Sequence, residues 1–350
     1  ATAGGELQKL TNDGQYVTGH AWLGEDIVFS SDRIGSRQLW YLSSENHAIS
    51  SLGFPGVRML STSRDGTKVA FESAHYTANI YRLASNEVEP TPRKIISSSA
   101  YDNYPSLSPN DDLLAFVSNR SGLVSIWMAD VDGRQTRMLL QQPRSRIVDP
   151  AWSADGKTLL ATRYIEGTSE ILEFSPETRQ VKVLSEMGEN VYGARFSGSW
   201  IYFINHESQD PVLARFPANG HGPVELTAVN ANRAIPGEDG LIYFTRPAQN
   251  GIFSFEPTSG SEKVVAPDLT AERWQSWAIN KSWLVYVRQV TNGGQVVIRK
   301  NLETNNTEIV TTFAPDTVGA TIEVSSDGKI LFIARTDRAE LDIKMIDLKK

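Results

Sequence analysis

Short apolar segments alternate with polar turns from one end of the chain to the other. In a typical stretch an apolar segment contains an aromatic residue (LAFVS, 114–118), a polar turn with glycine follows, and a second apolar segment comes after it (SIWMA, 125–129). Segments of this length that are rich in aliphatic and aromatic residues, and are bounded by Gly, Asn, Asp and Ser, predict β-strands. No helical periodicity extends beyond a single turn. The pattern therefore predicts an all-β protein.

The same pattern recurs eight times. One anchor residue marks the apolar segment that opens each copy of the pattern. The anchors are Phe29, Phe71, Phe116, Ala161, Phe203, Phe244, Tyr286 and Phe332, separated by 41 to 46 residues. A period of about 44 residues is typical of the four-stranded blades of a β-propeller. We therefore expect one domain, residues 1–350, folded as an eight-bladed β-propeller of four-stranded antiparallel blades. The expected blades are 17–56, 57–100, 101–146, 147–189, 190–229, 230–270, 271–318 and 319–350 plus 6–16.

The turns and the two ends of the chain suggest how the ring closes. YPSLSPNDD (104–112) and DPAWSADGK (149–157) contain Asn-Asp and Asp-Gly pairs, which favour tight hairpin turns. The last segment, LDIKMIDL (341–348), resembles a third strand without a fourth, and ELQKLT (6–11) resembles a fourth strand with none before it. We predict that the N-terminal strand completes the last blade and removes the exposed strand edges. An alternative, two stacked β-sandwiches, does not explain the constant period.

Composition and charge exclude several classes of function. The chain has 34 Lys and Arg against 41 Asp and Glu, a net charge of −7, so we expect no direct nucleic-acid binding by this segment. It has no cysteine, which excludes disulfides and thiolate metal sites. No stretch approaches the roughly 18 apolar residues of a membrane helix, and the first five residues lack the features of a signal peptide. We expect no membrane contact by this segment.

The repeats resemble those of a known family. SPNDDLLAFVSNRSGLVSIWMADVDG (108–133) and SSDRIGSRQLWYL (30–42) resemble the WD40-like (PD40) repeat of the TolB propeller family. The resemblance is close as far as residue 189, fades over 190–318, where the S-P-D-G motif is missing, and returns in SSDGKILFIA (325–334). TolB itself resembles a six-bladed propeller fused to another domain, whereas eight repeats are counted here.

A second resemblance concerns biological context. PRKIISSSAYDNYPSLSPN (92–110) resembles the C-terminal, periplasmic sensor propeller of CadC-like membrane-anchored transcriptional regulators. In that family a winged-helix DNA-binding domain and one membrane helix precede the propeller. The resemblance implies that the chain lies in the periplasm, or on the extracytoplasmic side of a bacterial inner membrane.

Candidate binding residues gather on one predicted face. In a propeller, the connections between blades and the loops between second and third strands surround the mouth of the central channel, where ligands usually bind. The ligand-binding candidates are His20, His75, Tyr76, Arg163, Tyr192, His206, Arg233, Arg246, Trp274, Arg288 and Arg335, with Arg33, Tyr104, Arg120, Asp149 and Tyr164 on the same face. Arginines with aromatic residues suit an anionic ligand or an acidic peptide. The alternative is that Arg163, Arg246, Arg288 and Arg335 brace equivalent strand ends.

Catalytic motifs are missing from the sequence. It contains no G-x-S-x-G elbow, no glycine-rich phosphate loop and no cysteine nucleophile, so we expect a non-enzyme without cofactor or metal. The five histidines lie on different repeats, and none shows the i, i+4 spacing of a helical metal site. Because His20, His75 and His206 share the predicted loop face, a metal-dependent lyase or hydrolase stays open as an alternative.

The sequence thus leads to one preferred function and two alternatives. The preferred function is a sensory or protein-interaction propeller, the extracytoplasmic domain of a CadC-like regulator, which binds a protein, a peptide or a small anion. The first alternative is a freestanding TolB-like periplasmic scaffold. The second is the metal-dependent enzyme.

Overall fold

The computed structural model describes residues 9–11, 17–31, 37–85, 90–165, 168–185, 190–207, 210–220, 222–291, 293–315 and 318–348. Its strands are β1 (Val17–Leu23), β2 (Asp26–Ser31), β3 (Gln38–Leu42), β4 (Ile49–Pro55), β5 (Val57–Thr62), β6 (Lys68–Ala84), β7 (Arg93–Ile96), β8 (Asn103–Leu107), β9 (Leu113–Ser118), β10 (Ser125–Asp130), β11 (Arg137–Leu140), β12 (Ser145–Trp152), β13 (Leu159–Ile165), β14 (Thr168–Phe174), β15 (Val181–Val183), β16 (Val191–Ser197), β17 (Trp200–Asn205), β18 (Val212–Pro217), β19 (Glu225–Asn230), β20 (Arg233–Pro236), β21 (Ile242–Thr245), β22 (Ile252–Phe255), β23 (Glu262–Ala266), β24 (Trp277–Asn280), β25 (Trp283–Gln289), β26 (Gln295–Asn301), β27 (Thr307–Phe313), β28 (Val318–Val324) and β29 (Ile330–Asp347). One 3₁₀ turn, η1 (Ala271–Arg273), precedes β24. Within these residues, no helix has the length and apolar character needed to cross a membrane.

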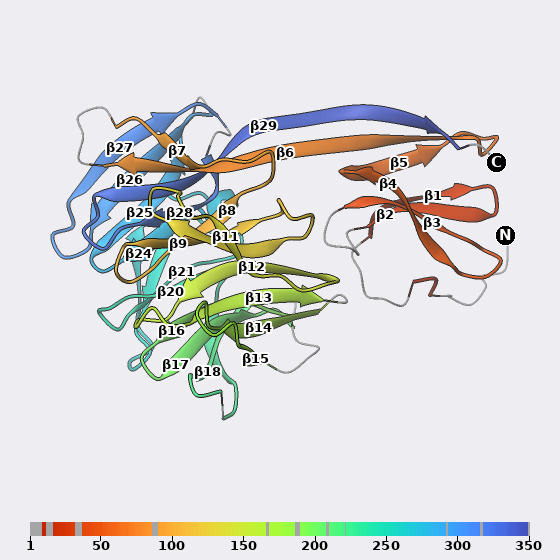
Figure 1. Cartoon of the computed structure of the whole chain (residues 1–350). Helices are drawn as coiled ribbons and strands as arrows, with labels where there is room; N and C mark the ends of the chain where they lie inside the picture. Colours follow the sequence, from red (N-terminus) through yellow and green to blue (C-terminus); the bar gives the residue numbers. More distant parts are fainter. Residues whose placement is uncertain are drawn as a thin grey trace.

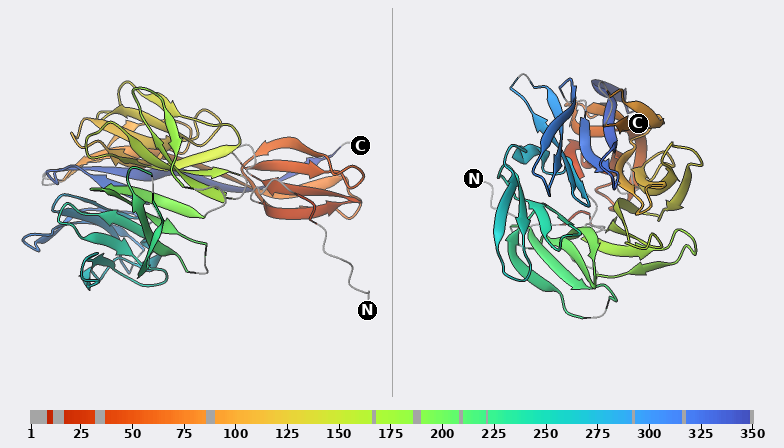
Figure 2. Two further views of the ribbon diagram at one scale, coloured as in Figure 1. Left: turned by 90° about the horizontal axis from the view of Figure 1, so that it is seen from below. Right: turned by 90° about the vertical axis from the view of Figure 1, so that its left-hand side faces the viewer.

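Six antiparallel sheets are arranged as a ring (Figure 2, right-hand view). Five of them are β8–β11, β12–β15, β16–β19, β20–β23 and β24–β27, and the sixth consists of β28, β29, β6 and β7. Each sheet packs against the next through its own hydrophobic cluster. Leu107, Phe116 and Phe332, for example, join the sixth sheet to the β8–β11 sheet and complete the circle. The other five junctions have equivalent clusters, so burial between neighbouring blades holds the ring together.

Two long strands leave the ring and form part of a second body. β6 and β29 pair antiparallel without interruption by a turn, from Lys68 opposite Asp347 to Ala84 opposite Ile330. One half of each strand lies in the sixth blade. The other halves, residues 68–76 and 338–347, join β5 in what we call the outer lobe, together with the β1–β4 sheet (Figure 1). The two sheets of the outer lobe enclose Val28, Leu39, Val57, Val69 and Phe71.

The predicted eight-bladed ring is not confirmed. The described residues form six blades in the ring and a β1–β4 sheet outside it. The last blade is completed by β6 and β7, whereas we predicted a strand from 6–16, of which residues 6–8 and 12–16 lie outside the described part. The physical reason lies in the repeats 57–100 and 319–350. Where the other repeats reverse direction, these two have AHYTA (74–78) and TDRAE (336–340), which contain neither Gly nor Pro and continue as strands.

The predicted hairpin turns between first and second strands are confirmed. Gly66, Gly156 and Gly328 adopt positive φ values of 67°, 70° and 71° at the Asp-Gly turns, and Asp111 does so at the Asn-Asp turn with φ 58°. In each Asp-Gly turn a serine hydroxyl donates to the aspartate carboxylate, as Ser153 does to Asp155 at 2.7 Å. In the ring, the turns at Asp111, Gly156 and Gly328 fix where β8, β12 and β28 end, and therefore which of their residues face the centre.

Candidate functional site in the central channel

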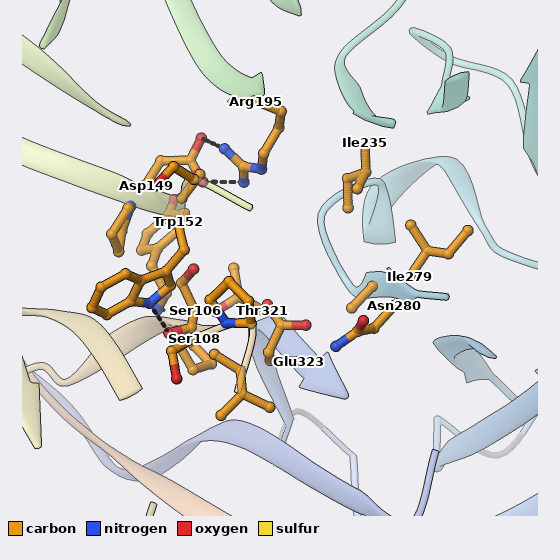
Figure 3. Close-up of a pocket in the computed structure, with 18 of the residues that line it drawn as sticks. Ser106, Ser108, Asp149, Trp152, Arg195, Ile235, Ile279, Asn280, Thr321 and Glu323 are labelled. Atoms are coloured by element: carbon orange, nitrogen blue, oxygen red, sulfur yellow. Dashed lines mark hydrogen bonds and ion pairs between the residues drawn. The ribbon is translucent and has the colours of Figure 1, made fainter. Parts of the chain in front are cut away.

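A cavity of about 260 Å³ lies at the centre of the ring. The innermost strands of all six blades contribute to its wall, and the residues drawn in Figure 3 surround it. Its polar and apolar lining includes Tyr104, Ser106, Asp149, Trp152, Arg195, Arg233, Ile235, Ile279, Asn280, Thr321 and Glu323. The cavity extends from the starts of the blades toward the turns at Ser108, Ala154 and Lys281. It is therefore the central channel of the propeller.

A repeated backbone irregularity positions the side chains of this channel. In β8, β12 and β16 the register with the second strand of the blade shifts at the same repeat position. The shift lies between Asn103 and Ser106, between Val148 and Ala151, and between Tyr192 and Arg195. The residue in the shift has a positive φ: Tyr104 at 51°, Asp149 at 56° and Gly193 at 71°. Such bulges redirect a side chain, and a non-glycine residue with positive φ is a strained feature that often accompanies function. Here Tyr104 and Asp149 line the channel.

A largely buried ion pair, with about 15% of each side chain exposed, joins two neighbouring blades inside the channel. Arg195 Nη2 donates to Asp149 Oδ1 at 2.7 Å, and Nη1 donates to Oδ2 at 3.2 Å (Figure 3). Burial alone raises the pKa of Asp149, but the charge and hydrogen bonds of Arg195, with the charge of Arg233, hold that pKa below its ordinary value. Asp149 is therefore ionised, and Arg195 is neutralised by it.

Arg233 brings a second positive charge into the same space. Its buried Nε has no hydrogen-bond partner among the described residues, and its guanidinium carbon lies 5.7 Å from the centre of the Trp277 ring. Burial and repulsion from Arg195 lower the pKa of Arg233, yet arginine stays protonated in proteins. A buried donor without an acceptor is costly, so an anionic group that reached Arg233 would gain a charge-assisted hydrogen bond.

Glu323 makes the charge of the channel dependent on pH. Burial raises the pKa of Glu323 to about 7, although the Val324 N–H donates to its Oε1 at 3.0 Å and two arginines lie near it. Below that pH the Glu323 carboxyl is neutral. Among Asp149, Arg195, Arg233 and Glu323 the net charge is then one positive charge, that of Arg233, because Asp149 and Arg195 neutralise each other. Above that pH, ionised Glu323 offsets the charge of Arg233.

Tyrosines surround a second, smaller cavity of about 50 Å³ at the blade-entrance end of the channel. Burial raises the pKa values of Tyr164 and Tyr192 to about 12 each, and it also raises the pKa of Tyr104. The three phenols are therefore neutral and retain a proton to donate. Trp274 lines the same cavity. This end of the channel offers aromatic surface and hydroxyl groups beside the charged centre.

The structure brings only some of the predicted binding residues together. Tyr192, Arg233 and Trp274 meet in the channel, with Tyr104 and Asp149. The predicted loop histidines are spread over three sheets: His20 is exposed on β1 in the outer lobe, His75 is exposed on β6 beside Tyr76, and His206 follows β17. Within the described parts of the chain no three His, Asp or Glu side chains form a metal-binding group.

The four arginines at strand ends have carboxylate partners near them in sequence or in the same blade. Arg163 pairs with the buried Glu170 on the adjacent strand, and Arg246 pairs with Glu262. Arg288 Nη1 lies 3.0 Å from Asp268 Oδ2, and Arg335 Nε lies 3.9 Å from Asp337 Oδ1. Arg335 also covers the Tyr81 ring at 5.0 Å. These contacts are the ones expected if the four arginines stabilise equivalent strand ends and do not bind a ligand.

Sequence reasoning missed Arg195, Thr321 and Glu323. Thr321 occupies the repeat position of Tyr104 and Asp149, and its hydroxyl donates to Asn103 Oδ1 at 2.5 Å, across the junction between the sixth blade and the β8–β11 blade. Arg195 and Glu323 occupy the position two residues later, where the well-matched repeats have Ser106 and Ala151. A charged residue at a position that is small in the well-matched repeats was the available signal.

Comparison with known proteins agrees with this geometry. Residues 1–154 match the family model described as the TolB beta propeller domain, PD40. The chain is also 31% identical, over 117 residues, to the Tol-Pal system protein TolB of Anaeromyxobacter dehalogenans strain 2CP-C. That similarity covers 33% of this chain and 26% of the relative, so the chain spans about a quarter of the length of the curated relatives it matches.

A solved structure shows the same fold. The crystal structure of TolB from Acinetobacter baumannii superimposes with a TM-score of 0.51 and 15% identity, over 87% of this chain and 77% of that one. An oligogalacturonate lyase in complex with manganese resembles the chain at a TM-score of 0.47 and 13% identity, over 72% and 76% of the two chains. A likeness at that level does not indicate that this chain shares the lyase activity or binds a metal. Residues 1–154 thus carry TolB-like repeats, and the chain shares the propeller fold of TolB.

Proposed function

We propose that this chain is a non-catalytic protein-interaction propeller whose channel binds an acidic side chain or a C-terminal carboxylate of a partner protein. The single observation that carries the proposal is Arg233, a channel-lining cation whose guanidinium forms no hydrogen bond or ion pair with the described residues, whereas the strand-end arginines are paired with carboxylates. The surrounding phenols and the Asp149–Arg195 pair give the channel donors and a fixed shape. Pre-arranged donors in a concave, partly apolar site are typical of ligand recognition.

The TolB resemblance supports a protein partner and an extracytoplasmic location. Two contexts fit it about equally: a freestanding TolB-like periplasmic scaffold, and the sensor domain of a CadC-like membrane-anchored regulator. The coding sequence upstream of Ala1 distinguishes them. A winged-helix domain followed by one membrane helix would establish the regulator, whereas a signal peptide alone would establish the scaffold.

A titration with two matched peptides tests the channel. The probes are acetyl-Ala-Glu-Ala-amide and its neutral analogue acetyl-Ala-Gln-Ala-amide, and the readout is NMR chemical-shift change at pH 6. We expect saturable binding of the acidic peptide alone. Arg233→Gln should abolish it, because the unpaired guanidinium is lost. Arg246→Gln, in the same blade but already paired with Glu262, should leave it unchanged.

The outcomes separate the channel from the arginines at strand ends. Equal binding of both peptides would contradict the proposal. Equal loss of binding in the two variants would indicate that the peptide binds at the arginines of the strand ends and not in the channel. Thermal unfolding of Arg233→Gln shows whether the variant is folded under the conditions of the titration.

A further inference from the structure

The outer edge of β29 lacks a neighbouring strand over half of its length. In the ring, β28 pairs with β29 as far as Val318 opposite Arg335. Beyond that point, from Arg338 to Asp347, the described residues provide a partner on one side only, which is β6. Figure 1 shows this part of β29 running along the outside of the outer lobe. No strand among the described residues pairs with its outward N–H and C=O groups, which is the arrangement that another strand can extend.

Charged side chains are the protection that this segment of the edge has, without a bulge or a proline. The only register shift between β29 and β6 lies between Thr336 and Arg338, and the ten residues that follow are regular and contain no proline. Leu341, Ile343 and Met345 share one face and are 57%, 86% and 60% exposed. Soluble proteins usually protect exposed edges with bulges, prolines or charged side chains, and here Asp342 and Lys344 carry charges of opposite sign. A long, regular edge with one apolar face is the geometry of strand addition.

We propose that this edge pairs with the same edge of a second copy of the chain, antiparallel and centred on Ile343. Residues directly opposite each other in antiparallel strands share a face and interact. In this register Leu341 faces Met345 of the second copy, and Asp342 faces Lys344 of the second copy. The two-fold axis repeats both pairs. The edge is therefore complementary to itself in charge and in apolar surface, as a two-fold interface requires.

Charge and length favour this register. Centring the pairing on Asp342 or on Lys344 would place like charges opposite each other at the axis, which destabilises a strand pair. Centred on Ile343, the pairing ends with Arg338 opposite Leu348 of the second copy, just before β28 occupies the edge at Arg335. Because the ring and the outer lobe lie at opposite ends of β29 (Figure 1), the antiparallel copies place their rings far apart.

A charge-exchange experiment tests the pairing. The self-association of wild type is measured by sedimentation equilibrium from about 10 µM to about 1 mM, the range in which a weak edge contact is observable. Asp342→Lys places lysine opposite lysine twice, and Lys344→Asp places aspartate opposite aspartate twice. Each single variant should raise the dimer dissociation constant about tenfold or more. The double variant, Asp342→Lys with Lys344→Asp, should restore it. Lys157→Asp, in an exposed turn, is the control and should leave it unchanged.

Mixing the two single variants gives the sharpest result. Each associates poorly with itself, but in a dimer of one with the other both charge pairs are complementary, so an equimolar mixture should contain the heterodimer. A wild type that stays monomeric throughout this range would overturn the proposal. A strand of another protein would then be the partner to test for this edge. A dimer that Asp342→Lys does not weaken would overturn it as well.

Discussion

Replacing Glu323 by glutamine should change how the stability of the protein depends on pH. Burial in the channel raises the pKa of Glu323 from an ordinary 4.5 to about 7. Between these values the folded protein keeps the proton and the unfolded chain has lost it. Because the folded state then binds more protons, the free energy of unfolding decreases as pH rises from about 4.5 to about 7, and this contribution is constant above that. Glutamine has no such proton.

The size of the effect follows from the shift of the pKa. One pKa unit corresponds to about 1.4 kcal/mol, so the raised pKa of Glu323 changes the free energy of unfolding by about 3 kcal/mol at most. Water in the open channel solvates the carboxylate and reduces this value. Relative to its stability at pH 4.5, wild type should lose about 2 to 3 kcal/mol more than Glu323→Gln by pH 8. Urea unfolding followed by tryptophan fluorescence at the two pH values measures this double difference.

The control for this experiment is Glu303→Gln, which removes an exposed glutamate from the turn after β26 and should leave the pH dependence as in wild type. Identical pH dependence in wild type and Glu323→Gln would refute the reasoning. It would mean that water in the channel, or the arginines near Glu323, stabilise its carboxylate in the folded protein as well as bulk water does in the unfolded chain.

Two further predictions concern packing and binding. Asp149→Asn keeps the shape of the side chain but leaves Arg195 buried without its carboxylate, so urea unfolding should show a loss of about 3 kcal/mol; a loss below about 1 kcal/mol would contradict a buried pair. At Gly133, φ is +84° and an added Cβ would lie 1.9 Å from the Ile95 carbonyl oxygen, whereas at Gly240, with φ +82°, it would meet nothing within 4 Å. Gly133→Ala should therefore cost at least about 2 kcal/mol more than Gly240→Ala in the same assay, and equal losses would show that backbone strain alone decides the cost.

The regular part of the fold could be predicted from the sequence because it rests on local signals. Alternating apolar residues gave the strands, and the Asp-Gly turns at Gly66, Gly156 and Gly328 gave the hairpins between first and second strands. The number of blades in the ring could not be obtained by counting repeats. It depends on whether the chain reverses at AHYTA (74–78) and TDRAE (336–340), and on long-range pairing between strands about 260 residues apart. The lack of Gly and Pro in these two segments was the local signal for the continuous strands.

The candidate site was predictable only in part for a similar reason. Tyr104, Asp149 and Arg233 occupy equivalent positions at the starts of blades, so periodicity alone placed them near the channel mouth. Arg195 and Glu323 lie two positions further along, on repeats with weakened motifs, and only the ring brings their charges together. His75 was misplaced through the assumption that every repeat turns at the same place, because it lies within a continuous strand.

The ring of six blades is tested most directly by cross-linking two positions that only this ring brings together. Ser326 Oγ donates to Asp111 Oδ2 at 2.6 Å, across the junction between the sixth blade and the β8–β11 blade. Because the chain contains no cysteine, the double variant Asp111→Cys with Ser326→Cys carries the only two thiols. A short bismaleimide should link them within one chain, detected by intact mass and by altered gel mobility. In an eight-bladed ring the blades 17–56 and 57–100 would separate the two positions. Failure to cross-link in the folded double variant would contradict the six-bladed ring.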